Sequence, residues 1–283
     1  MADEIYYFSG TGNSLHVARE LQKKMPGAVL IPIVHLLQNS TIRTNADRIG
    51  LVFPNFCLTI PIAVHDFLEK ADLNSARYIY AVCTRGGSPS EAFVYINEII
   101  KKQGKKINAQ LNINMPWNHP LGKENLTDSI NDKNLENYDR EMQNKLETFS
   151  RCIREGEEYI RPDDDVILKL PSWMNAFNGL ISRSFNYKSH NFMYQKLIGF
   201  YSDSKCNGCT ICEKVCLAGK IKLINKKPGW EKGAKCYACF ACINFCPQQA
   251  IQIKSNFLIK SYTDVNGRYH HSAVSCGDIA AQR

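Results

Sequence analysis

Two cysteine runs near the C-terminus constrain the fold of this chain more than any other feature. Each run has the spacing C-x2-C-x2-C-x3-C, and together they contain eight cysteines: Cys206, Cys209, Cys212 and Cys216, then Cys236, Cys239, Cys242 and Cys246. The two-residue gaps let a tight loop place three thiolates around one cubic [4Fe-4S] cluster, while the fourth cysteine turns away from it. Thiolate sulfur suits iron because it is soft and negatively charged.

The doubled motif predicts two [4Fe-4S] clusters with crossed ligation, because the fourth cysteine of each run reaches the cluster of the other run. We expect one cluster on Cys206, Cys209, Cys212 and Cys246, and the other on Cys236, Cys239, Cys242 and Cys216. A structural zinc site needs only four ligands and would leave four of these cysteines unused. Disulfides need an oxidising compartment, whereas the chain opens with MADEIYYFSG and shows no apolar signal segment. We therefore expect a cytoplasmic iron–sulfur protein.

The rest of the chain must form a second globular unit. The cluster module needs only the last quarter of the 283 residues. Hydrophobic residues make up 44% of the whole chain, so the remainder can bury a sizeable core. No apolar run approaches the roughly 20 residues that a membrane-spanning helix requires. The sequence therefore predicts no membrane span.

The basic balance of the chain largely disappears once the clusters are counted. The formal net charge is +8, and each cluster with its four thiolates contributes about −2. Several lysines surround the cysteine runs: Lys220, Lys222, Lys226, Lys227, Lys232 and Lys235. We expect these lysines to steer an acidic redox partner protein rather than to bind nucleic acid.

The first residues have the pattern of an anion-binding loop. Residues 4–8 (EIYYF) are typical of a short buried strand and residues 15–24 of an amphipathic helix. The loop between them consists of Ser9, Gly10, Thr11, Gly12, Asn13 and Ser14. Here the helix dipole and free N–H groups attract an anion, and the hydroxyls add donors. Because the loop has neither a Walker A lysine nor the spacing G-x-G-x-x-G, a phosphate monoester fits better than ATP or a dinucleotide.

Strands and helices continue to alternate after this loop. We expect strands at 29–33, 49–53, 78–84 and 107–114, and helices at 61–69 and 89–102. With the first strand, this pattern predicts an α/β fold with an open parallel sheet of five strands. Ligands of such sheets bind at the carboxyl ends of the strands, beside the point where the strand order reverses. The loops at these ends are residues 9–14, 54–60, 84–88 and 115–118.

The sequence resembles a known family in these loops. F-S-G-T-G-N-S is similar to the FMN phosphate loop of flavodoxins, and F-P-N-F-C-L-T-I-P and C-T-R-G-G-S look like their two flavin-ring loops. The order of this unit, then M-P-x-N, then two ferredoxin runs resembles the flavodoxin–ferredoxin fusion proteins of anaerobic bacteria and some anaerobic protists. The resemblance implies a flavodoxin-like domain that binds FMN, followed by a small α+β ferredoxin-like domain with two [4Fe-4S] clusters.

The resemblance also implies which residues contact FMN. Ser9, Thr11, Gly12, Asn13 and Ser14, with Gly10 in the same loop, would hold the phosphate. One face of the flavin ring would be covered by Pro54, Asn55, Phe56 and Cys57, and its pyrimidine side by Thr84, Arg85, Gly86 and Gly87. Phe56 and Trp117 would either stack on the flavin or pack in the core. Arg85 would either stabilise an anionic reduced flavin or lie in solvent.

The predicted domain limits are 1–160 for the flavodoxin-like domain, 161–200 for a helical connector, and 201–283 for the ferredoxin domain with its tail. A charged helix is expected at about 135–159, before a break at 161–165. Residues 171–201 carry aromatic side chains at roughly helical spacing, which should either pack between the domains or line a substrate pocket.

Two kinds of redox group in one chain predict electron transfer. We expect an intracellular iron–sulfur flavoprotein that passes electrons between the two clusters and FMN. The alternative is a flavin-dependent reductase of a small-molecule acceptor, such as a quinone or a nitroaromatic compound, fed through the clusters. No acid–base pair, nucleophile or substrate-metal site is evident, and Cys57, Cys83, Cys152 and Cys276 fit no metal spacing.

Overall fold

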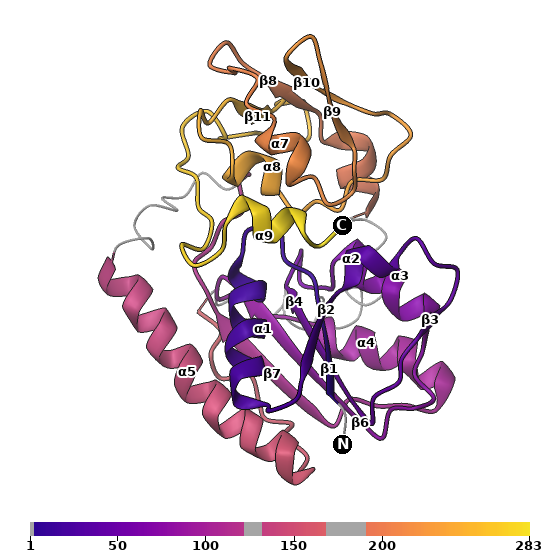
Figure 1. Ribbon diagram of the computed structural model, residues 1–283. Helices are drawn as coiled ribbons and strands as arrows, with labels where there is room; N and C mark the ends of the chain where they lie inside the picture. Colours follow the sequence, from indigo (N-terminus) through magenta and orange to yellow (C-terminus); the bar gives the residue numbers. More distant parts are fainter. Residues whose placement is uncertain (1–2, 122–131, 168–190) are drawn as a thin grey trace.

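A five-stranded parallel sheet forms the centre of the first unit (Figure 1). The computed structural model describes residues 3–121, 132–167 and 191–283. The strands of the sheet lie in the order β2 (Val29–Pro32), β1 (Asp3–Tyr7), β4 (Arg48–Pro54), β6 (Tyr78–Arg85) and β7 (Ala109–Asn114). The strand order reverses at β1, since the chain moves to one side for β2 and to the other side for β4. This is the flavodoxin-like order, and the fold predicted from the sequence is confirmed.

Helices cover the sheet in two pairs. α1 (Asn13–Lys24) packs beside α5 (Asp132–Glu155), and α3 (Ile62–Lys70) packs beside α4 (Ala92–Ile100). Right-handed crossover connections explain this division. The connection from β1 to β2 runs along the sheet in one direction, and the connections from β4 to β6 and from β6 to β7 run in the other. Their helices therefore lie on opposite faces of the sheet. The minor elements are α2 (Ile33–Leu36), the paired strands β3 (Ile42–Arg43) and β5 (Ala71–Asp72), and the 3-10 turn η1 (Lys101–Gln103).

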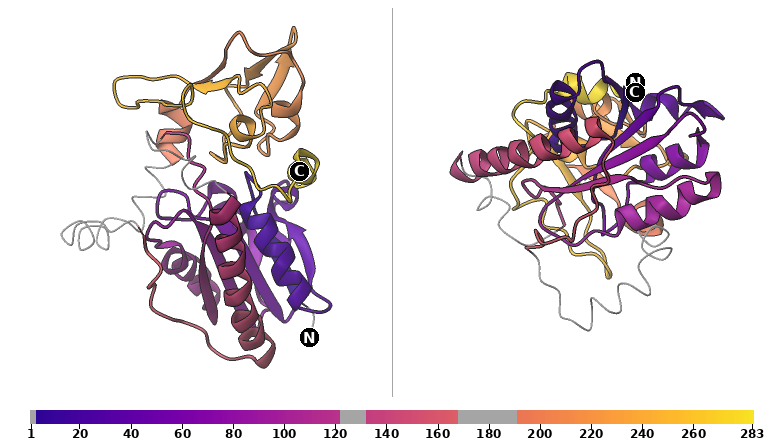
Figure 2. Two further views of the ribbon diagram at one scale, coloured as in Figure 1. Left: turned by 90° about the vertical axis from the view of Figure 1, so that its left-hand side faces the viewer. Right: turned by 90° about the horizontal axis from the view of Figure 1, so that it is seen from below.

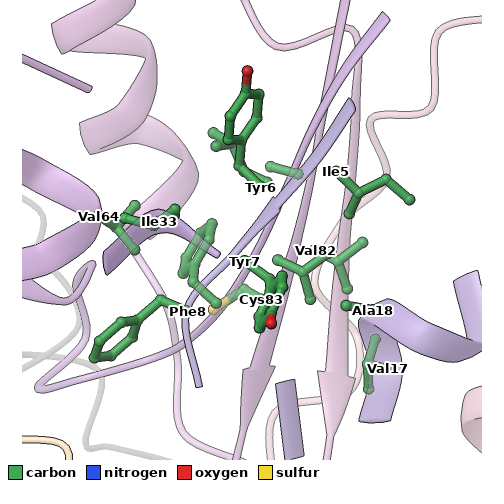
Figure 3. Packing of buried hydrophobic residues seen from close by; sticks show 14 of the residues in the cluster. Ile5, Tyr6, Tyr7, Phe8, Val17, Ala18, Ile33, Val64, Val82 and Cys83 are labelled. Carbon is green, nitrogen blue, oxygen red and sulfur yellow. The ribbon is translucent and has the colours of Figure 1, made fainter. Parts of the chain in front are cut away.

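Alternate residues of β1 fill the cores on opposite faces of the sheet (Figure 3). The Tyr6 ring lies 4.8 Å from the ring of Phe67 on α3. Ile5 and Tyr7 point to the other face, where Val17 of α1 is buried. This period of two is expected of a strand that is covered on both faces. It fixes the direction in which β1 delivers the loop that follows it.

Residues 191–283 form a second unit around the two cysteine runs. Its strands are antiparallel pairs, β8 (Phe200–Ser202) with β11 (Ile251–Ile253), and β9 (Ile221–Ile224) with β10 (Lys227–Trp230). Its short helical elements are the π-helical turn η2 (Met193–Leu197), α7 (Ile211–Lys214), α8 (Ala241–Asn244) and α9 (Cys276–Ala280). This unit sits over the carboxyl ends of the sheet strands, with α9 between the two units (Figures 1 and 2).

The last helix of the first unit is shorter at its C-terminus than the sequence predicts. The predicted helix at 135–159 is wrong at its C-terminus, because α5 ends at Glu155 and Gly156 adopts a left-handed φ of 74°. Tyr159 instead forms a parallel bridge with Ala109, the first residue of β7. Much of the predicted connector and of the aromatic segment lies outside the described residues, and the predicted domain limits stay predictions. Within the described residues, no helix has the length and apolar character needed to cross a membrane.

Candidate functional site

Loops at the carboxyl edge of the sheet surround a cavity of about 240 Å³, here called the sheet-edge cavity. The loops follow β1, β4, β6 and β7, as the sheet topology requires of a ligand site. Of the residues expected to contact FMN, all but Gly12 and Gly87 line this cavity. Gly12 instead packs against Val274, and Gly87 packs against Ile167.

The loop after β1 presents backbone donors at the start of α1. Gly12 has a φ of 101°, which turns the chain so that α1 begins at Asn13. The backbone N–H groups of Thr11, Asn13 and Ser14 donate to no acceptor in the described part of the chain. An anion at the N-terminus of a helix supplies such an acceptor and is stabilised by the helix dipole. The geometry of this loop therefore fits the phosphate of FMN.

Side chains of this loop are tied to the loop after β7. The amide of Asn13 donates to the carbonyl oxygen of Pro116 at 3.1 Å, and the amide of Asn118 donates to the hydroxyl of Thr11. These hydrogen bonds therefore stabilise the conformations of both loops. Asn118 was not among the predicted residues, although it belongs to the M-P-x-N motif at the same sheet edge.

A tight hairpin after β4 forms the next part of the wall. Phe56 and Thr59 exchange both backbone hydrogen bonds, at 2.9 and 3.0 Å, across a two-residue turn of Cys57 and Leu58. These two residues have φ values of 48° and 67°, the left-handed conformation that a type I′ turn requires at both central positions. The amide of Asn55 anchors the hairpin by donating to the carbonyl oxygen of Pro89 at 2.9 Å. Glycine or asparagine usually occupies such a turn, so the hairpin is held by its surroundings.

A buried arginine at the end of β6 forms an ion pair with an exposed aspartate. The Arg85 side chain has no exposed surface and forms a bidentate pair with Asp163, with Nη2 and Oδ1 at 2.6 Å. Its Nε donates to Asn114 at 3.0 Å. The interpretation of Arg85 as a solvated surface residue is therefore wrong. Gly86 is required here, because a Cβ atom at this position would lie 2.8 Å from the Cβ of Trp117.

Both predicted aromatic residues line the cavity. The Phe56 ring contacts Phe8 edge-to-face, with ring centroids 6.3 Å apart. The Trp117 ring is nearly parallel to the ring of His119, at 6.4 Å and an angle of 12°. Neither side chain is fully buried, so each presents apolar surface to the cavity. Stacking on a flavin stays a prediction for both residues.

The far wall of the cavity comes from residues that were not among those expected to contact FMN. It consists of His119, Tyr194, Ala238, Cys239 and Phe240. The Tyr194 hydroxyl lies 2.8 Å from Nε2 of His119, and both rings meet the Phe240 ring edge-to-face, at 5.5 and 5.4 Å. Burial lowers the pKa of His119 to about 4, so its imidazole is neutral at pH 7. His119 directly follows the M-P-x-N motif, and this position was the one sequence feature that could have indicated its place at the sheet edge.

The eight cysteines of the two runs surround two further cavities. Cys206, Cys209, Cys212 and Cys246, here called the outer set, line one of them. Cys216, Cys236, Cys239 and Cys242, here called the inner set, line the other. These are the sets expected from crossed ligation, although ligation itself stays a prediction. In the described part of the chain, no three His, Cys, Asp or Glu side chains lie close enough together for a single metal ion.

Backbone geometry around the thiols fits four-iron clusters. The N–H groups of Ala238 and Ala250 donate to the sulfur atoms of Cys236 and Cys246 at 3.4 and 3.3 Å. Such bonds stabilise thiolates, which burial alone disfavours, since it raises the pKa of Cys236 to about 11. Iron would supply the positive charge that keeps these sulfurs deprotonated.

The C-terminal arm, residues 269–283, closes over the loop after β1. The side-chain amide of Gln282 donates to the Ser9 carbonyl oxygen at 2.8 Å and accepts from the Ser9 N–H at 3.0 Å. The N–H of His271 donates to the carbonyl oxygen of Thr11 at 2.9 Å, and the Tyr269 hydroxyl donates to the amide oxygen of Asn13 at 3.1 Å. The arm therefore contacts the candidate phosphate loop along its length.

The cysteine-rich region matches a known family. Residues 205–251 match the model of the family described as 4Fe-4S dicluster domain. A 49-residue segment is 43% identical to a subunit of the ion-translocating oxidoreductase complex of Methanosarcina acetivorans, covering 17% of this chain and 18% of that protein. The chain therefore carries an iron–sulfur domain of the 4Fe-4S type, while it spans less than a fifth of that relative.

Several solved structures align with the first unit. A flavodoxin from the domain Archaea is 16% identical, covering 52% of this chain and 99% of that chain, with a TM-score of 0.31. An azoreductase from Bacillus anthracis is 14% identical, with 53% and 100% covered and a TM-score of 0.33. An NAD(P)H:quinone oxidoreductase from Methanothermobacter marburgensis is 10% identical, with 51% and 94% covered and a TM-score of 0.30. These scores are too low to bear on function, and the fold assignment rests on the strand order.

Proposed function

We propose that this chain is a cytoplasmic electron-transfer flavoprotein in which two [4Fe-4S] clusters exchange electrons with FMN. The observation that carries the proposal is the position of Cys239, which lines both the cavity of the inner set and the sheet-edge cavity. A cluster on the inner set and a flavin at the sheet edge would share this residue as a wall. FMN would supply the ability to exchange one or two electrons, whereas a cluster passes one at a time.

The sheet-edge cavity supplies what FMN needs from a protein. Free N–H groups at the start of α1 face the position expected for the phosphate, and Thr11 offers its hydroxyl beside them. Phe56 and Trp117 offer apolar ring surface for the isoalloxazine. No adenine-binding fingerprint follows β1, which favours FMN over FAD.

The outer set would serve as the port for a redox partner protein. Cys209 is exposed, and exposed lysines lie beside this loop, since Nζ of Lys227 donates to the Cys206 carbonyl oxygen at 2.9 Å. Lys235 is not available for a partner, because it forms an ion pair with Asp66 at 2.6 Å. Lys220 and Lys227 donate to uncharged carbonyl groups and keep their net positive charge. The exposed lysines would attract a redox partner with an acidic surface and raise its rate of association.

A reductase of a small-molecule acceptor is the second candidate. The observation in its favour is the pair of His119 and Tyr194, whose polar atoms line the sheet-edge cavity. Such groups could hydrogen-bond a quinone or a nitro compound beside the flavin. Steady-state oxidation of the reduced protein by ferredoxins, quinones and nitro compounds separates the candidates. Turnover with protein carriers alone supports the electron-transfer protein, and saturable turnover with one class of small molecule supports the reductase.

Cofactor analysis tests the proposal directly. Protein purified without oxygen should contain about eight irons and eight sulfides per chain, as two four-iron clusters require. Denaturation should release FMN. The substitution Cys239→Ala should remove or degrade one cluster, whereas Cys276→Ala, outside both sets, should leave the iron content unchanged. Release of FAD, absence of flavin, or equal iron loss in the two variants would contradict the proposed function.

A further inference from the structure

The inner loop, residues 236–242, has an unusual backbone. Ala238 and Phe240 both have a φ of 54°, in the left-handed region. The corresponding positions of the outer run are Gly208 and Thr210, with φ values of 76° and 69°. The backbones of both runs therefore follow the same path around their cavities. At the first of the two left-handed positions the outer run has Gly208, which adopts this conformation without steric strain, whereas the inner loop has Ala238. A non-glycine residue keeps such a conformation only where its surroundings enforce it.

This strained loop abuts the candidate phosphate loop. A Cβ atom on Gly10 would lie 2.3 Å from the carbonyl oxygen of Cys239, so the two backbones are in direct contact. The Tyr237 ring meets the Phe8 ring edge-to-face at 6.1 Å, just before the phosphate loop. A shift of the inner loop would therefore change the wall of the sheet-edge cavity.

The inner loop also holds the remaining part of the far wall. Gln195 on η2 donates its amide to the Cys236 carbonyl oxygen at 2.6 Å and accepts from the Cys236 N–H at 2.9 Å. Tyr194 precedes Gln195 and contacts Phe240, with ring centroids 5.5 Å apart. The conformation of residues 236–240 thus sets the positions of Tyr194 and Phe240, which both line the cavity.

We propose that the flavin site is composite and is complete only when the inner set holds its cluster. Four sulfur atoms bound to one cluster would fix the inner loop in its left-handed path, and this path forms the wall opposite the loops of the sheet. The outer loop, residues 206–212, does not line the sheet-edge cavity. Loss of the outer cluster should therefore have little effect on the affinity for FMN. The inference rests on the proposed function, because it takes FMN as the ligand. By linkage, bound FMN stabilises the inner cluster by the same factor as the cluster strengthens FMN binding.

Two matched substitutions test the inference. Cys242→Ala removes a ligand of the inner set that does not itself line the sheet-edge cavity, and Cys212→Ala does the same for the outer set. FMN is titrated into flavin-free protein without oxygen, and its fluorescence quenching gives the dissociation constant. We expect about a ten- to hundredfold loss of affinity in Cys242→Ala and less than about threefold in Cys212→Ala. EPR spectra of each reduced variant verify that the other cluster is retained.

A second measurement needs no variant. A ferrous-iron chelator is added to the flavin-free parent protein and to the same protein saturated with FMN, and iron release is followed over time. FMN should slow the release of about half of the iron and leave the other half unaffected. Equal affinity losses in the two variants, or release kinetics that FMN does not change, would overturn the inference. Failure of the parent to bind FMN would instead overturn the proposed function.

Discussion

Strained residues gather around the sheet-edge cavity. In the described part of the chain, eight non-glycine residues have positive φ, and four of them line this cavity: Cys57, Leu58, Ala238 and Phe240. The left-handed conformation costs an L-residue about 1–2 kcal/mol. Two of the four residues belong to each unit, so opposite walls of the cavity are both held in costly conformations. Strain of this kind is found at sites whose shape is needed for function.

The hydroxyl of Thr11 provides a prediction at the same scale. It lines the sheet-edge cavity beside the free N–H groups at the start of α1. Thr11→Val keeps the volume of the side chain and removes its hydroxyl. The loss of a charge-assisted hydrogen bond to phosphate costs about 1.5–3 kcal/mol, and FMN affinity should fall roughly ten- to a hundredfold in a fluorescence titration.

Thr44→Val is the matched control for this substitution. Thr44 is also buried, and its hydroxyl donates to the carbonyl oxygen of Asp72 at 2.6 Å, away from the cavity. The control should lose stability but keep its affinity for FMN. If the Thr11 variant bound FMN as tightly as the parent, the phosphate would have to lie elsewhere.

At the scale of elements, local patterns could be predicted from the sequence and distant contacts could not. The strand predicted at 4–8 is β1 at Asp3–Tyr7, and the phosphate loop leads into α1 as expected. Hydrophobic periodicity and glycine-rich turns are local properties, so they are visible in a sequence. Other contacts join residues from opposite ends of the chain. Gly10 touches Cys239, and the C-terminal arm covers the loop after β1. No local pattern encodes such pairs, so the sequence did not place the far wall beside the loops of the sheet.

The C-terminal arm is an element whose packing should depend on pH. Burial, and then the neighbouring His16, lower the pKa of His271 from 6.5 to about 4. The His271 ring stacks on His16 at 3.9 Å, and Asp139, Glu20 and His270 also act on it. When the arm detaches, His271 regains its usual pKa and binds a proton more readily between pH 6.5 and pH 4. The attachment of the arm is therefore strongest above pH 6.5 and weakens as the pH falls toward 4.

Hydrogen exchange measures this attachment. Amides of residues 269–283 should exchange severalfold faster at pH 5 than at pH 7.5, after correction for the intrinsic rates. His271→Gln removes the titrating group and should flatten this dependence, whereas His65→Gln, on α3 and in contact with Asp66 and Tyr95 rather than with the arm, should keep it. The same pH dependence in all three proteins would rule out His271 as its source.

At the scale of the whole molecule, the two units are docked by contacts spread along their interface. Cys239 touches Gly10, Lys235 pairs with Asp66 at 2.6 Å, and Gln282 forms two hydrogen bonds with Ser9. The sequence suggested docking through the aromatic segment at 171–201, most of which lies outside the described residues. Within its described part, Tyr194 joins the two units, since its hydroxyl lies 2.8 Å from Nε2 of His119. The other contacts named here lie outside that segment. They favour a rigid arrangement over two carriers joined by a free linker.

A rigid arrangement predicts electron exchange within one chain. After a one-electron pulse to the clusters of the oxidised, FMN-loaded protein, flavin reduction should follow first-order kinetics with a rate constant independent of protein concentration. A rate proportional to concentration would mean that electrons pass between molecules, and the internal path would have to be abandoned. Absorbance at the flavin and cluster bands, recorded over a tenfold range of protein concentration, distinguishes the two cases.

Gly10→Ala tests whether the internal path depends on the docked loops. Its new Cβ atom overlaps the carbonyl oxygen of Cys239, so the loops must separate, whereas Gly233→Ala adds a Cβ atom that meets nothing within 4 Å. Internal transfer should slow in the first variant and keep the parent rate in the second. Because the clash lies between two backbones, no side-chain movement can relieve it, and an unchanged rate in Gly10→Ala would show that electrons reach the flavin by another route.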